Sequence, residues 1–132
     1  MADYDGDYDY TTAARKKKER LGDFVLKVDD RSKYYKLNRM KKPSGTALLT
    51  DTAFGNAAAD ERNIGLGCWK FTAFDVNSDY AGVAPRHGDR ANLAFADGHG
   101  QSLGIHQMHE TPSRIRGFII AGERYQIPYL DF

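Results

Sequence analysis

The stretch "RHGDRANLAFADGHGQSLG" at residues 86–104 decides the fold that we expect for this 132-residue chain. Its centre, "ANLAFA", alternates in polarity and places Leu93 and Phe95 on one face of a β-strand. The Asp-Gly pair at 97–98 follows directly and favours a two-residue type I′ turn, since both central positions of that turn need positive φ. The returning residues bring Leu103 back to the apolar face. The stretch therefore predicts a β-hairpin.

Short segments on both sides of the hairpin predict further strands and little helix. Residues 11–22, "TTAARKKKERLG", have the pattern of a short helix that Gly22 ends in the left-handed conformation. The strand-like segments lie at 23–28, 46–53, 68–74, 117–122 and 125–132. In the first of these, alternation places Phe24, Leu26 and Val28 on one face.

These segments predict the α+β class, mainly an antiparallel β-sheet with little helix. We expect a single domain over 1–132, with an N-terminal segment and short helix at 1–22 and a β-rich body at 23–132. The apolar strands are expected to form one antiparallel sheet. Pro128 restricts the last strand to an edge of that sheet, because proline cannot donate a ladder hydrogen bond.

The composition excludes several classes of function. The 19 basic and 18 acidic residues give a net charge of +1, so no global field draws in nucleic acid or a membrane surface. Cys68 is the only cysteine, which excludes an intrachain disulfide and a four-cysteine zinc site. No stretch reaches the roughly 18 apolar residues that span a bilayer, and the acidic start at Met1 does not resemble a signal peptide. As given, the chain is expected to be soluble.

The four histidines raise the question of a metal or catalytic site. Imidazole and carboxylate groups suit Zn²⁺ or Fe²⁺, but the spacing matches no metalloenzyme signature. His106 and His109 share a helix face only if their segment is helical. Ser102 lies near His99 in sequence but has no nucleophile elbow around it. Scattered surface histidines are the preferred interpretation.

The charged N-terminal segments have similar alternatives. "DYDGDYDY" at 3–10 places carboxylates at every second residue, but the EF-hand positions for glycine and glutamate hold Tyr8 and Ala14. A solvated, turn-rich segment is the preferred interpretation. The run from Arg15 to Lys18 is interpreted as a solvated helix face, with a binding patch as the alternative.

The hairpin stretch resembles the His-x9-Asp-Gly signature near the C-terminus of prepilin-like proteins. His87 is followed by nine residues, "GDRANLAFA", and then by Asp97 and Gly98. The motif residues are Arg86, His87, Gly88, Asn92, Phe95, Asp97, Gly98 and His99. The chain departs from the pattern at Asp89, where a second glycine is common, and at Gly100. "MKKPSGTALLTDTA" at 40–53 also resembles the family's turn and strand that ends in aspartate.

The resemblance implies a pilin-like globular domain related to type II secretion pseudopilins and type IV pilins. Such subunits have a long apolar N-terminal helix, an inner-membrane precursor and a filament on the periplasmic side or the cell surface. This chain lacks that helix, and membrane contact is expected only through it. If the helix has been removed, some apolar surface should be uncovered. The candidates are Trp69, Phe71, Leu93 and Phe95.

The motif is expected to have a structural role and no catalytic residue. We expect His87 to bond the backbone or Asp97, Gly88 to adopt positive φ, and Asn92 to cap a turn. No cofactor is expected; the rival hypothesis is a Ca²⁺ site that uses Asp97 or Asp89, as in related major pseudopilins.

Three functions follow, in order of preference. The first is a non-catalytic structural subunit that self-associates and contacts other pilin-like subunits. The second is a soluble binding or adhesion module derived from the same fold. The third is a metal-dependent hydrolase that uses His87, Asp97 and His99. No nucleic-acid partner is expected.

Overall fold

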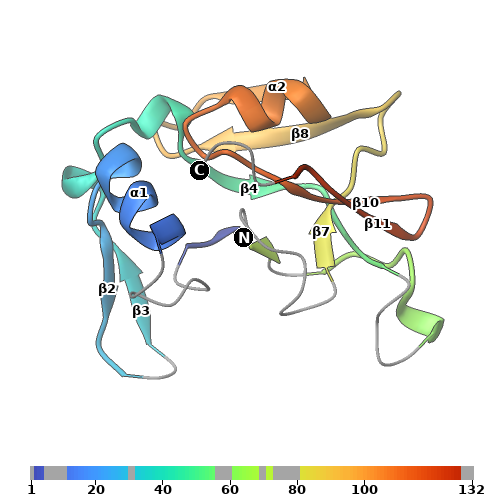
Figure 1. Ribbon diagram of the computed structural model, residues 1–132, viewed down its shortest axis with the longest axis horizontal. Helices are drawn as coiled ribbons and strands as arrows, with labels where there is room; N and C mark the ends of the chain where they lie inside the picture. The colour runs from blue at the N-terminus through green and yellow to red at the C-terminus, as the bar shows by residue number, and fades with distance from the viewer. Residues whose placement is uncertain are drawn as a thin grey trace.

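Small β-sheets dominate the computed structural model of the protein, and few helices accompany them (Figure 1). The structure describes residues 2–4, 12–29, 32–55, 61–68, 71–72 and 81–128. The predicted sheet-dominated α+β class is confirmed. The expectation of one antiparallel sheet is wrong, because the described strands form four sheets and two of the strand pairs are parallel.

The predicted hairpin forms the larger part of a three-stranded antiparallel sheet. Its strands are β8 (Arg90–Phe95) and β9 (Gly100–Gly104), and β4 (Ala47–Thr50) pairs with the other edge of β8. Leu93 and Phe95 are buried as predicted. Alternation in β8 works because one face of this central strand lies on the core and the other faces solvent.

The turn of this hairpin differs from the predicted two-residue type. Phe95 and His99 pair across a three-residue loop: the Phe95 N–H donates to the His99 carbonyl and the Gly98 N–H donates to the Phe95 carbonyl, both at 2.9 Å. Only Gly98 adopts positive φ there, at 93°. The extra loop residue belongs to the turn-plus-bulge class of hairpins, in which a single left-handed glycine suffices.

A second sheet has the strand order β11-β10-β7-β5. Its strands are β10 (Gly117–Ile120), β11 (Glu123–Gln126), β7 (Ala81–Val83) and β5 (Thr52–Phe54). The predicted strand at 117–122 is confirmed. The last strand begins earlier than predicted and ends before Pro128, and it lies at a sheet edge.

Residues 12–29 and 32–45, which are rich in basic side chains, form one end of the molecule, at the left of Figure 1. Helix α1 (Thr12–Leu21) is followed by the antiparallel ribbon of β2 (Val25–Lys27) and β3 (Lys33–Tyr35). The short 3-10 turns η1 (Leu37–Arg39) and η2 (Pro43–Gly45) come next.

Two details of this end confirm or correct the sequence-based expectations. The predicted helix is confirmed, and Gly22 ends it with φ 99° and a hydrogen bond to the Lys18 carbonyl. The prediction of a shared apolar face at 23–28 is wrong: Phe24 is buried, whereas Val28 is 64% exposed. Only one face of this two-stranded ribbon, at one of its ends, packs against the core. Alternation in the sequence therefore does not guarantee that a side chain is buried.

Tyr4, at the start of the N-terminal acidic segment, contributes to the core; positions 5–10 of that segment lie outside the described residues. Tyr4 is buried, and its ring packs edge-on against Phe24 at a centroid distance of 5.3 Å. The Tyr4 hydroxyl donates to the Ala47 carbonyl and lies 3.0 Å from Ser113 Oγ. The buried Lys17 ammonium donates to the Tyr4 carbonyl. The expectation of solvated side chains is therefore wrong for Tyr4 and for Lys17.

Tyr4 is held by strand pairing as well as by its side chain. Strand β1 (Ala2–Asp3) pairs in parallel with β6 (Phe71–Thr72). Burial raises the pKa of the Tyr4 hydroxyl, so the phenol stays neutral and keeps its donor role.

The expected uncovered apolar face does not occur at the described positions. Phe71, Leu93 and Phe95 are all buried in one core cluster that also contains Tyr4 and Met108. Met108 belongs to α2 (Ile105–Glu110), which lies along β8 in Figure 1. Trp69 lies outside the described residues. In the part of the chain that the structure describes, no helix is long and apolar enough to cross a membrane.

Gly22 should be indispensable for joining α1 to η1. A Cβ at Gly22 would lie 2.2 Å from the Arg39 carbonyl oxygen, and the residue also has positive φ. We expect Gly22→Ala to lower the free energy of unfolding by about 3 kcal/mol, measured by urea denaturation. Gly65→Ala is the matched control, because Gly65 has φ 81° but nothing within 4 Å of an added Cβ. It should lose only about 1 kcal/mol; equal losses would contradict the steric role of Gly22.

Candidate functional site

Asp51 joins the two larger sheets. It lies between β4, which pairs with β8, and β5, which pairs with β7. The Asp51 side chain accepts a hydrogen bond from the Asn92 N–H at 3.0 Å, and its main-chain carbonyl accepts one from the Ala84 N–H at 2.9 Å. One residue therefore bonds to both sheets at the point where the chain passes from one to the other.

His87 reaches the same carboxylate from the loop before β8. Its side-chain Nε2 lies 3.4 Å from Asp51 Oδ2, and its backbone N–H donates to the Arg90 carbonyl at 3.0 Å. The loop closes tightly because Gly88 and Asp89 both have positive φ, at 60° and 62°. The His87 side chain therefore lies beside Asp51 and not beside Asp97, and the bond to the backbone is made by the main-chain N–H of His87.

Two other motif residues also hold the framework. Arg86 donates from Nη2 to the Gly65 carbonyl at 2.6 Å and to the Thr52 carbonyl at 3.3 Å. Its guanidinium thus connects the turn at 63–66 to β5. Asn92 was expected to cap a turn with its side chain. In the structure its backbone N–H makes the contact with Asp51, and the residue is otherwise exposed.

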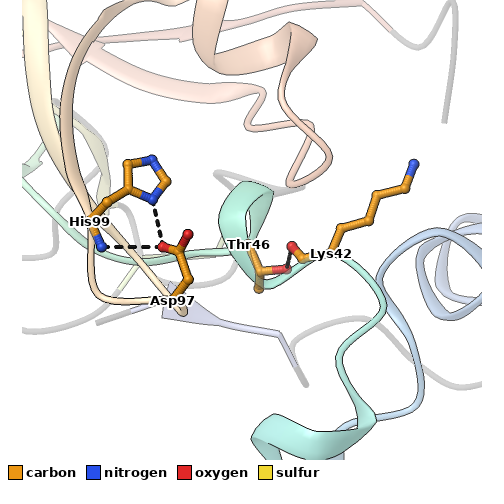
Figure 2. Close-up of polar contacts among 4 residues, drawn as sticks. All are labelled: Lys42, Thr46, Asp97 and His99. Carbon is orange, nitrogen blue, oxygen red and sulfur yellow. Dashed lines mark hydrogen bonds and ion pairs between the residues drawn. The ribbon is translucent and has the colours of Figure 1, made fainter.

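The hairpin tip holds a second polar cluster (Figure 2). Asp97 Oδ1 lies 2.5 Å from His99 Nδ1 and accepts the His99 N–H at 3.2 Å. The His99 ring stacks on Phe95 at a centroid distance of 4.5 Å and an interplanar angle of 5°. The hydrogen bond from the His99 side chain is the main reason that the pKa of Asp97 lies below its ordinary value of 3.8.

The tip is tied to the start of β4. The Ala96 N–H donates to the Thr46 carbonyl at 2.9 Å, and the Thr46 hydroxyl donates to the Lys42 carbonyl at 2.8 Å (Figure 2). Thr46 is buried, so these contacts give its polar groups partners inside the fold. The turn before β4, which belongs to the stretch at 40–53 noted in the sequence, therefore holds the hairpin tip in place.

The two polar clusters are separated by the length of β8. Asp89 precedes this six-residue strand and Asp97 follows it, which places them about 20 Å apart. One Ca²⁺ ion cannot use both carboxylates over that distance, since ligand oxygens lie about 2.4 Å from Ca²⁺. His87 and His99 are separated in the same way, so the structure does not bring together the His87, Asp97 and His99 set considered for a hydrolase.

The remaining histidines lie on α2. The segment is helical, which meets the condition under which His106 and His109 share a face. Among the described residues, no three histidine, cysteine, aspartate or glutamate side chains are grouped so that they could hold a metal ion. In this geometry, the contacts of both polar clusters hold loops in place beside the strands.

The sequence did not point to the contacts of Ser113 with Tyr4. The Ala47 N–H donates to Ser113 Oγ at 2.8 Å, and Ser113 Oγ donates to the Gly45 carbonyl at 2.9 Å. Tyr4 and Ser113, whose hydroxyl oxygens lie 3.0 Å apart, are 109 positions apart in the sequence. A single serine in a loop carries no periodic pattern, so only the tertiary structure reveals its role.

Removing the Asp51 carboxylate should loosen the junction between the sheets. We expect Asp51→Ala to lower the free energy of unfolding by about 1–2 kcal/mol, because the Asn92 N–H loses its acceptor. The exposed Glu123→Ala is the control and should cost less than about 0.5 kcal/mol. A double-mutant cycle with His87→Ala should give a coupling of about 0.5 kcal/mol, the size typical of polar contacts between partly exposed side chains. Full additivity would contradict the His87–Asp51 contact.

The pH response of the hairpin tip should depend on His99. Because the pKa of Asp97 is lowered in the folded state, its contribution to stability is present above pH 3.8 and is lost as the pH falls through the lower, folded value. We expect His99→Ala to move the pKa of Asp97 back towards 3.8, measured by NMR titration of its carboxyl carbon. His87→Ala, at the other end of β8, should leave the pKa unchanged. The opposite pattern would refute the Asp97–His99 pair.

Comparisons of the chain with models of protein families, with curated protein sequences and with solved structures give no match. The function is therefore argued from the motif and from the contacts that its residues make.

Proposed function

We propose that this chain is the globular domain of a pseudopilin- or type IV pilin-like subunit, with a structural role in a filament and no catalytic activity. The observation that carries the proposal is the use of the His-x9-Asp-Gly motif in the fold. His87 contacts the carboxylate that also binds the backbone of β8, and Asp97 contacts His99 at the other end of that strand.

These contacts favour a scaffold over an enzyme. A catalytic site needs polar groups that converge on one place where a substrate can bind. Here the motif's polar groups point to backbone and side-chain partners at two separate ends of a strand. The arrangement supports a domain that presents loops on a rigid frame.

In this proposal the mechanism is self-association. An apolar helix that precedes this sequence in the full-length subunit would anchor the precursor in the inner membrane and pack in the filament. The globular domain would contact neighbouring subunits, other pilin-like proteins or exported cargo through its exposed loops. The resemblance of residues 86–104 supports this assignment beyond what the contacts alone suggest.

The test is the N-terminus of the protein as its own cell makes it. Mass spectrometry of the membrane fraction should find a longer chain that begins with a methylated residue and an apolar helix. The same peptides should co-purify with sheared surface or periplasmic filaments. A native start at or near Met1, recovered only in the soluble fraction, would refute the filament role and favour a soluble binding or adhesion module.

A further inference from the structure

The charges of this protein are divided unevenly along the chain. Residues 12–42 hold twelve of the 19 basic residues but only four of the 18 acidic ones, a net charge of +8. The rest of the chain carries a net charge of −7. The overall value of +1 therefore conceals a strongly basic segment.

The described residues of this segment, 12–29 and 32–42, are gathered at one end of the folded molecule (Figure 1). The backbone N–H of Lys41 donates to the Leu21 carbonyl at 2.9 Å, which joins the chain after η1 to the end of α1. The Lys36 N–H donates to the Phe24 carbonyl at 2.8 Å, which joins β3 to the start of β2. α1, the ribbon and η1 therefore lie next to one another, which brings their basic residues into one part of the molecule.

The β2–β3 ribbon exposes apolar side chains within this basic surface. One of its faces carries Val25 and Tyr35, which pack against the core. On the other face Leu26 lies directly opposite Tyr34, and Tyr34 is 59% exposed. Val28, two residues beyond Leu26, is also exposed. The ribbon therefore has one face that anchors it and one that points away from the protein.

Cations flank these apolar groups. Lys27 lies directly opposite Lys33 on the ribbon face that also carries Val25 and Tyr35, and both lysines are exposed. Leu37 in η1 is 56% exposed and lies between Lys36 and Arg39, which are exposed as well. We call residues 25–29 and 32–39 the basic apolar end.

We propose that the basic apolar end binds peripherally to the surface of a membrane that contains anionic phospholipids. Clustered lysine and arginine residues are attracted to anionic headgroups, and neighbouring aliphatic side chains gain by entering the boundary between headgroups and acyl chains. The exposed apolar groups here are the aliphatic Leu26, Val28 and Leu37 and a single aromatic, Tyr34. Single-stranded nucleic acid is recognised by several stacking aromatics, so this composition favours lipid.

The experiment is sedimentation of the 132-residue protein with vesicles. Vesicles of phosphatidylcholine with about one-third phosphatidylglycerol should pellet the protein, whereas pure phosphatidylcholine should not. Binding should weaken strongly between 50 and 500 mM salt, because salt screens exposed charges. Each cation near an anionic surface contributes to the free energy of binding. Removing two of them with Lys33→Gln and Lys36→Gln should weaken binding roughly thirtyfold.

Matched variants locate the contact. Arg62→Gln with Arg124→Gln removes the same charge outside the basic apolar end and should change binding less than about threefold. Val28→Asn with Leu37→Asn should weaken binding roughly tenfold or more. Leu49→Asn with Leu66→Asn removes side chains that are similarly exposed, at 53% and 56%, and should have little effect.

Several results would overturn the proposal. These are equal binding to neutral vesicles, equal losses in the control variants, or no binding by protein whose circular dichroism shows it to be folded. Tighter binding to a 20-base single-stranded oligonucleotide than to vesicles would assign the surface to nucleic acid instead. A dimer in sedimentation velocity that Lys33→Gln with Lys36→Gln abolishes would assign it to a second copy.

Discussion

The hydrogen bonds of Asp51 are the constraint on which the arrangement of the two larger sheets depends. Its carbonyl bonds to the chain beside β7, and its carboxylate bonds to the backbone of β8. Without such a residue, a strand that switches between sheets would leave polar groups without partners at the junction, at a cost of about 1–3 kcal/mol each if buried. His87 adds a third contact to the same carboxylate and positions the loop before β8.

This junction gives the His-x9-Asp-Gly motif a physical meaning. The nine residues between His87 and Asp97 contain the six residues of β8, so the spacing measures one central strand with a loop at each end. The histidine fastens one end to Asp51, and the aspartate fastens the other to His99. Residues separated in this way support a rigid scaffold better than a reaction centre, which is why we propose a structural role.

The uneven charge distribution adds a surface to this scaffold. A net charge of +1 predicts no global attraction to a membrane, yet attraction acts over about 10 Å at ordinary salt and so depends on local charge. The basic apolar end provides that local charge together with exposed aliphatic groups. The two proposals are independent, because peripheral binding by the basic apolar end requires neither an apolar helix nor a filament.

Local sequence was enough to predict the features that depend on neighbouring residues: the hairpin with Leu93 and Phe95 facing the core, the short α1 ended by Gly22, and the sheet-dominated class. These features follow from local periodicity and backbone preference, which act over a few residues. Contacts between residues that are distant in sequence became visible only in the folded protein. Tyr4 is buried although it lies in an acidic segment, and His87 meets Asp51 because the strands bring them together. Such contacts depend on how strands are ordered into sheets, and no local pattern encodes that order.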